Sequence, residues 1–257
     1  MKKLIYFSLT MLIFSFFTIS CSQDDTEVVP KLLTTKTIKF NNGSIYKVNE
    51  YTYDETKLTQ ILSKDGNNNV LGKVTIEYNM EFPIRLNKYD GNENLIEYIS
   101  IEYESNQPIK YIKFNSIDNT ALKFLITYTT NGITKNIYSG DFVNQDNFIK
   151  SIDYEINNEN VVKVTSNNYI INYTYDDSNG IFKNITSKSI LNITGILHNP
   201  LDYGVNNNAL SYEYIQGNIT DHINRNHTYD SQNYPINTQE VSTEFGNSNI
   251  IEYEYNH

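Results

Sequence analysis

The residues in this sequence best suited to chemistry are its histidines. His222 and His227 lie five positions apart, and His198 precedes them. Imidazole nitrogens are common zinc ligands, but a strand places residues five apart on opposite faces, so this pair would need a bend and a third ligand. We therefore expect no metal site and no cofactor.

A second candidate for chemistry is the segment DDSN at 176–179, whose oxygen atoms suit calcium. It lacks the spacing of a full calcium loop and reads more simply as a turn. The sequence contains no glycine-rich phosphate loop, nucleophile elbow or metalloprotease helix. We therefore expect a protein that is not an enzyme. A glycan-active enzyme with paired carboxylates is a distant alternative.

The pair Tyr53-Asp54 could also be catalytic, but its position recurs along the chain. Tyr53, Tyr78, Tyr103 and Tyr128 are spaced 25 residues apart, and each ends an alternating segment: NEYTY, VTIEY, ISIEY and FLITY. Four copies in register indicate a structural repeat, because a catalytic pair would have to be active in only one of them. The tyrosine is expected to close a strand and the aspartate to begin a turn.

Each 25-residue unit has room for two strands and two turns. In KVTIEY at 73–78, apolar and polar residues alternate, as they do when one face of an antiparallel sheet is buried. The connectors KDGNNN at 64–69 and YDGNEN at 89–94 supply residues that tolerate positive φ. No segment of the mature chain shows a convincing helical period. The sequence thus predicts about sixteen short strands, more than the roughly ten that an open sheet usually holds without curling.

The predicted fold is all-β, with repeated antiparallel hairpins in a large curled sheet that is either barrel-like or a flattened sandwich. Curling buries the apolar face, and closure removes the exposed edge strands. A membrane barrel, with apolar residues outward and polar residues inside, is the alternative architecture.

The N-terminus reads as an export signal. Lys2 and Lys3 precede an apolar run too short to span a membrane as a helix, and TISC, ending at Cys21, resembles a bacterial lipobox. We expect residues 1–20 to be a signal peptide, 21–33 a lipidated cysteine with an acidic tether, and 34–257 one β-repeat domain with an irregular segment at 186–226. The acyl chains would anchor the protein to the outer membrane, and the acidic residues after Cys21 predict exposure at the cell surface.

The net charge of the chain argues against nucleic acid as a partner, and its cysteine content rules out an intrachain disulfide. Loss of Lys2 and Lys3 with the signal peptide changes the formal net charge from −10 to −12, which disfavours nucleic acid as a partner. Cys21 is the single cysteine of the chain, so no intrachain disulfide can form.

The segment YTYDETKLTQI, followed by KDGNNNV, resembles a YD repeat, the unit of bacterial toxin shells and teneurin barrels. Thr56 and Lys57 stand where that repeat usually has Gly-Arg. The chain is more similar to a group of Bacteroidota surface lipoproteins of unknown function with degenerate YD-like hairpins, as in YDDSNGIFKNI at 175–185 and YDSQNYPI at 229–236. This resemblance implies an architecture and export, and no chemistry.

The irregular segment is the predicted place for a ligand, because loops on a regular scaffold often carry binding residues. The candidate contacts are His198, Asp202, Tyr203, His222 and His227. A long hairpin with variable loops is the simpler interpretation of the same segment. The expected function is a non-catalytic envelope lipoprotein that binds a glycan, a peptide or a partner protein, and the alternative is a structural spacer.

Overall fold

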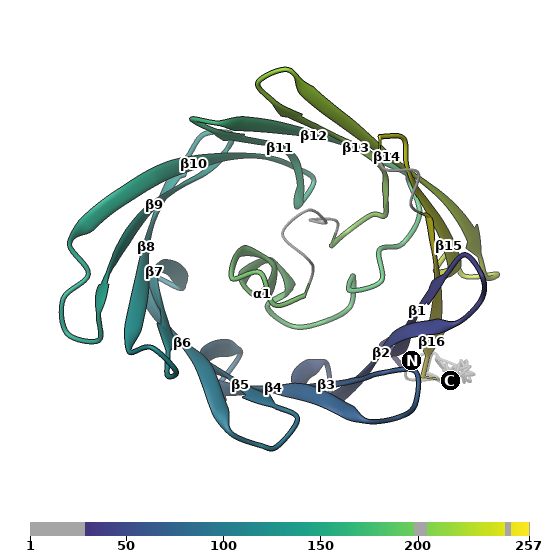
Figure 1. Cartoon of the computed structure of the whole chain (residues 1–257), viewed down its shortest axis with the longest axis horizontal. Coiled ribbons are helices and arrows are strands. Elements are labelled where there is room, and N and C mark those ends of the chain that lie inside the picture. Colours follow the sequence, from purple (N-terminus) through teal and green to yellow (C-terminus); the bar gives the residue numbers. More distant parts are fainter. Residues whose placement is uncertain (1–28, 198–204, 245–247, 257) are drawn as a thin grey trace, which may run out of the picture.

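The computed structural model describes residues 29–197, 205–244 and 248–256. These residues form sixteen strands and one short helix (Figure 1). The strands are β1 (Leu33–Phe40), β2 (Ile45–Asp54), β3 (Lys57–Lys64), β4 (Val70–Asn79), β5 (Phe82–Asp90), β6 (Leu95–Glu104), β7 (Gln107–Asn115), β8 (Thr120–Thr129), β9 (Gly132–Asp141), β10 (Asn147–Asn157), β11 (Asn160–Ser166), β12 (Tyr169–Tyr175), β13 (Ala209–Gln216), β14 (Ile219–Tyr229), β15 (Pro235–Ser242) and β16 (Ser248–Tyr255).

The strands close into one antiparallel barrel. Each strand pairs with its neighbours in the sequence, and β1 pairs with β16, for example through Ile38 opposite Ile251. The predicted all-β class and the barrel-like arrangement are confirmed, and the flattened sandwich is wrong. Closure gives each of the sixteen described strands two hydrogen-bonded neighbours, so none of them is an edge strand.

The apolar face of the sheet points inward. Ile76 and Ile101 are each 6% exposed, whereas their neighbours Glu77 and Glu102 are exposed. Cross-strand ion pairs lie on the outer face, with nitrogen–oxygen distances of 2.6 Å for Lys64–Glu50 and for Lys110–Glu102 and 3.1 Å for Lys163–Glu155. This is the arrangement predicted from the alternation, and it is the reverse of the membrane-barrel alternative.

The repeated tyrosines join successive hairpins. Each hydroxyl donates to the backbone carbonyl 20 residues earlier, on the preceding strand: Tyr53 to Leu33 (2.8 Å), Tyr78 to Leu58 (3.0 Å), Tyr103 to Pro83 (2.6 Å), Tyr128 to Pro108 (3.1 Å) and Tyr255 to Pro235 (2.9 Å). Burial raises the pKa of each of these hydroxyls, which keeps it protonated as a donor. The repeat is therefore structural.

The two ends of the barrel have different turns. At one end, β2–β3, β4–β5, β6–β7, β8–β9 and β10–β11 are joined by two residues each. At the other end the turns are mostly longer, and Asp65 shows how they form: its Oδ1 accepts from the backbone N–H groups of Asn67 (2.8 Å) and Asn69 (2.9 Å). Asp90 makes the same turn with Asn92 and Asn94, so the predicted connectors are confirmed.

The connection between β12 and β13 enters the barrel. Its described parts, residues 176–197 and 205–208, are called the plug here, and they include the helix α1 (Lys188–Ile193). Figure 1 shows α1 inside the ring of strands. No helix among the described residues is long and apolar enough to cross a membrane.

Two expectations about this region are wrong. No helix was predicted from the sequence, but α1 is one. Its six residues make fewer than two turns, which is too short to leave a periodic pattern in the sequence. The predicted bounds 186–226 of the irregular segment are also wrong: the described residues outside the strands are 176–197 and 205–208, and β13 and β14 occupy 209–216 and 219–229 with an alternating burial pattern. The described parts of this connection are packed inside the barrel (Figure 1).

Candidate ligand pocket in the barrel lumen

The first half of the plug is bonded to the end of the barrel that has the two-residue turns. The backbone N–H of Thr186 donates to the carbonyl of Thr56 (2.9 Å), and the hydroxyls of the two threonines lie 2.7 Å apart. Ser187 donates to the carbonyl of Glu81 (2.5 Å), and Asn184 donates to that of Lys31 (3.0 Å). We call this the plugged end, and the opposite one the open end.

The second half of the plug returns to the wall at β11. Asn160 Oδ1 accepts from the backbone N–H groups of Val205 (3.3 Å), Asn206 (3.1 Å) and Asn207 (3.3 Å). Asn160 is 3% exposed, so its amide oxygen replaces the water that these N–H groups would otherwise bind. The plug is therefore held at both of its ends.

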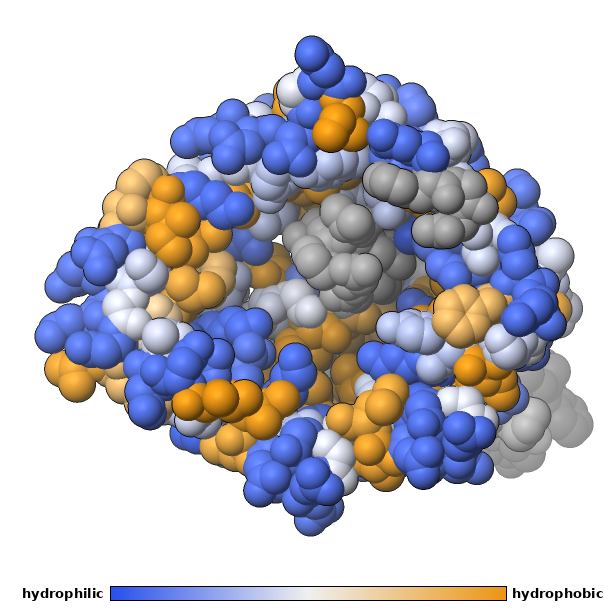
Figure 2. Space-filling model, in the orientation of Figure 1, coloured by the Kyte–Doolittle hydropathy of each residue, from blue (hydrophilic) through white to orange (hydrophobic). Residues whose placement is uncertain are grey.

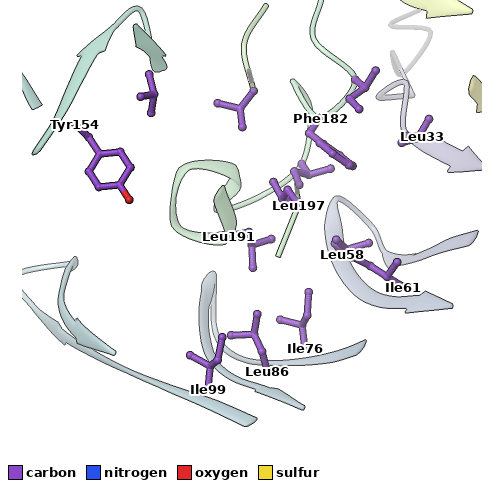
Figure 3. Close-up of a cluster of buried hydrophobic side chains, with 14 of the residues drawn as sticks. Leu33, Leu58, Ile61, Ile76, Leu86, Ile99, Tyr154, Phe182, Leu191 and Leu197 are labelled. Atoms are coloured by element: carbon purple, nitrogen blue, oxygen red, sulfur yellow. The ribbon is translucent and has the colours of Figure 1, made fainter. Parts of the chain in front are cut away.

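The middle of the plug is held by apolar contact. Phe182, Leu191 and Val205 have no exposed surface, and the Phe182 ring meets that of Tyr51 edge-on with 5.6 Å between centroids. Figure 3 shows Phe182, Leu191 and Leu197 pointing toward Leu58, Ile61, Ile76 and Leu86 of the wall. The core of the protein is thus formed between the plug and the inner face of the sheet.

Packing of the plug leaves a cavity of about 410 Å³ between its residues Ile196 and Leu197 and strands β1–β5. This lysine pocket is lined by Lys36, Ile38, Tyr46, Lys47, Asn49, Tyr51, Ile61, Ser63, Val74, Lys88, Ile196 and Leu197. Its volume lies in the range of small-molecule sites. Figure 2 shows a hollow inside the ring, with hydrophobic residues within it and hydrophilic residues around much of the rim.

A second cavity of about 190 Å³ adjoins the lysine pocket and shares Lys47, Ser63, Val74 and Lys88 with it. Gly72 lines the second cavity opposite Ser63 on the neighbouring strand. A Cβ at Gly72 would lie 2.4 Å from the Tyr89 carbonyl oxygen, so a side chain cannot be accommodated there. The glycine therefore allows the β5 backbone to approach β4 closely at the edge of this cavity.

The electrostatics of the lysine pocket are one-sided. Of the described residues that line it, three are lysines and none is acidic. Burial, and then repulsion from Lys88, lower the pKa of Lys47 below its usual value. The acidic neighbours are already occupied: Glu97, opposite Lys88 on β6, lies 2.7 Å from Lys113, and Asp90 accepts the bonds of its own turn.

The structure separates the predicted contacts. His222 lies on the outer face of β14, with Nε2 3.6 Å from Glu213 Oε1. His227 lies on the inner face, with Nδ1 2.7 Å from Thr238 Oγ1 and Nε2 2.9 Å from the Ala209 carbonyl oxygen. The opposite faces expected for this pair are confirmed, and the two histidines do not form one site. Cys21, His198, Asp202 and Tyr203 lie outside the described residues.

The DDSN segment acts as a plug anchor. Asp176 Oδ1 accepts from the backbone N–H groups of Ser178 (3.1 Å) and Asn208 (3.0 Å), and Tyr229 donates to Oδ2. Within the described ranges, no group of three histidine, cysteine or acidic side chains is arranged to hold a metal ion. The carboxylate of Asp176 is thus used to tie the start of the plug to its end.

The pocket lysines were missed in the sequence analysis. Lys36, Lys47 and Lys88 each occupy an inward position of an alternating strand, two residues from Ile38, Asn49 and Leu86 respectively. These lysines could have been found by looking for charged residues at strand positions whose side chains face the barrel interior, because most such positions are apolar.

Comparison with known proteins identifies the fold and no family. No family model matches the chain, and no curated protein matches it. A porin-like protein from Bacteroides uniformis has 10% sequence identity and a TM-score of 0.55, covering 87% of this chain and 96% of its own. A porin-like protein from Bacteroides vulgatus has 10% identity and a TM-score of 0.53, covering 88% and 99%. The chain therefore shares its barrel fold with porin-like proteins of Bacteroides.

Proposed function

We propose that this chain is a non-catalytic lipoprotein of the cell envelope that binds a ligand inside its barrel. The observation that carries the proposal is the lysine pocket, a concave site with apolar walls and a few convergent polar groups, as small-molecule sites have. The ligand would enter from the open end, because the plug fills the other end.

The envelope location rests on the N-terminal sequence and on the barrel surface. Ion pairs and threonines on the outer face do not suit contact with lipid chains, so attachment falls to the predicted acyl chains on Cys21. The likeness to porin-like proteins of Bacteroides and the resemblance to Bacteroidota lipoproteins agree with this compartment.

Two other functions fit the structure less well. An open channel, which the likeness to porin-like proteins suggests, conflicts with the fully buried Phe182 and Leu191 in the middle of the barrel. A structural spacer needs no cavity. The spacer remains the alternative if no ligand enters the lumen.

Filling the cavity should abolish ligand binding. Ser63 lines both cavities, so Ser63→Phe places a ring in the space beside Gly72. The adjacent Leu62 alternates with Ser63 and faces outward, which makes Leu62→Phe a matched control. The chain from residue 22 onward, which contains every described residue, is screened against glycan, peptide and metabolite panels by thermal shift. A ligand that binds the wild type and Leu62→Phe, but not Ser63→Phe, supports the proposal.

Two outcomes of the screen would count against it. Binding that survives Ser63→Phe would place the site outside the lumen. A complete absence of ligands would favour the structural spacer. Circular dichroism of both variants shows whether the barrel remains folded.

Anchoring is tested separately. Cys21→Ala removes the thiol that the lipid would modify, so the protein should leave the detergent-extracted membrane fraction and incorporate no labelled fatty acid. Equal labelling of wild type and Cys21→Ala would show that the lipobox reading is wrong. Cys21 is the single cysteine, so no other thiol can take its place.

A further inference from the structure

We infer that the lysine pocket selects a small amphiphilic anion, a ligand with one anionic head and a short apolar chain. This inference deepens the proposed function and rests on it. The pocket contains both halves of such a site: three lysines with Asn49 and Ser63 for the head, and Ile38, Ile61, Val74, Ile196 and Leu197 for the chain.

The cationic half stands out against the rest of the molecule. The whole chain has a formal net charge of −10, yet the described lining of the pocket carries only positive charges. Among the described residues, neither Lys47 nor Lys88 forms an ion pair with a carboxylate, whereas lysines of the outer wall such as Lys64 and Lys110 do. An anion in the pocket would supply the counter-charge that the wall omits.

Repulsion between the lysines works in the same direction. Burial and the nearby Lys88 make the charged form of Lys47 less favourable, because two of the three lysine charges lie close together in a partly desolvated space. A bound anion relieves this repulsion and accepts charge-assisted hydrogen bonds, which are stronger than neutral ones. Asn49 and Ser63 already bond to each other at 2.8 Å and form a fixed polar edge beside the lysines.

The apolar half sets the second requirement. Ile61 and Tyr51 are buried in the floor, and Leu197 of the plug, 5% exposed, closes the side facing the barrel centre. At the mouth, Tyr46 is 56% exposed and Leu71, in the adjoining cavity, is 50% exposed. A purely ionic ligand would leave these surfaces unused, because burial of apolar area stabilises only a ligand that brings apolar area of its own.

Isothermal titration calorimetry with four probes tests the inference on the chain from residue 22 onward. Octanoate and octyl phosphate carry an anionic head, octyl glucoside a neutral one, and octyltrimethylammonium a cationic one. We expect both anionic probes to bind and the other two to bind at least about tenfold more weakly, the scale of lost charge-assisted bonds. Binding of octanoate should weaken with added salt.

The variants assign the effect to the lysines. Lys47→Gln/Lys88→Gln should weaken octanoate binding by about tenfold or more, because it removes two charges from the head site. Lys64→Gln, on the outer face of β3 and paired with Glu50, should leave it within about twofold. Lys47→Arg keeps the charge and should retain binding, which separates loss of charge from loss of fold.

Several results would overturn the inference. The first is a failure of octanoate to bind, and the second is binding of octyl glucoside as tight as that of octanoate. The third is octanoate binding by the double variant that equals that of the wild type. The fourth is inorganic phosphate binding as tightly as octyl phosphate, which would remove the apolar requirement. A neutral ligand from the screen that Ser63→Phe blocks would leave the proposed lumen function standing while this inference fails.

Discussion

Phe182→Ala should lower the free energy of unfolding by about 3–5 kcal/mol, the cost of removing a buried phenylalanine from a packed core. Phe182 is fully buried in the plug, and its ring contacts Tyr51 on β2. The plug is fixed at both ends by hydrogen bonds, so it cannot collapse into the space that the ring leaves. Denaturant titration of the chain from residue 22 onward measures the change.

The matched control is Ile117→Ala. Ile117 is also apolar but is 75% exposed in the β7–β8 turn, so its truncation should change the unfolding free energy by no more than about 0.5 kcal/mol. Equal effects of the two substitutions would show that the plug is not part of the cooperative core. Because Tyr51 also lines the lysine pocket, Phe182→Ala should in addition weaken ligand binding.

Stability should rise between about pH 7 and pH 9.5 by up to about 3 kcal/mol through one buried lysine, Lys135. Lys135 is 5% exposed, its Nζ donates to the Ile193 carbonyl at the end of α1 (3.1 Å), and it lies 4.2 Å from the centroid of the Tyr154 ring. Burial lowers the pKa of Lys135 to about 7. Among the described residues, no carboxylate forms an ion pair with it.

The sign follows from the two protonation states. Below about pH 7 both the folded and the unfolded protein hold the proton, so the folded state carries a buried charge at full cost. Above that value the folded state releases the proton while the unfolded state keeps it up to its ordinary pKa of 10.5, and the cost declines as the pH rises. Above about pH 10 the tyrosines with raised pKa act in the opposite direction.

Lys135→Met should remove this slope. Urea titrations at several pH values would show a flatter profile for Lys135→Met, whereas Lys163→Met, which replaces an outer lysine paired with Glu155, should keep the slope of the wild type. Lys47, whose pKa is also lowered, contributes in the same direction and is present in both variants. An unchanged slope in Lys135→Met would mean that the amine is solvated in the folded protein.

The wall of the barrel could be predicted because its local rules repeat. Tyr53, Tyr78 and Tyr103 mark the same point of each unit, and the alternation around Ile76 and Ile101 determines which face is inside. Such periodic signals are independent of distant parts of the chain. The sequence could not decide between a closed barrel and a flattened sandwich, because the pairing of β1 with β16 that closes the barrel joins residues more than 200 positions apart.

The plug and the pocket could not be predicted, because both depend on contacts between distant elements. Leu191 and Phe182 lie in a segment without a period, and only their burial against the sheet reveals them as core residues. Lys47 and Lys88 are 41 positions apart and line one cavity because of strand register and barrel curvature. His227 was chosen for its residue type, and the structure uses it to bond β14 to Thr238 and Ala209.

The seam between β1 and β16 makes the barrel a ring with no structurally fixed first strand. The first and last described segments of the chain meet there, since the N–H of Asn256 donates to the Leu32 carbonyl (3.0 Å) and the Leu32 N–H donates back to the Asn256 side chain (2.6 Å). A circular permutant that joins these ends and opens at Ser105-Asn106 would keep every strand pair, with its new termini at a two-residue turn. Because each hairpin is a local unit, synthesis of the barrel could begin at any of its strands and still give the same strand pairs. Only the plug connection between β12 and β13 distinguishes one position of the ring from the others.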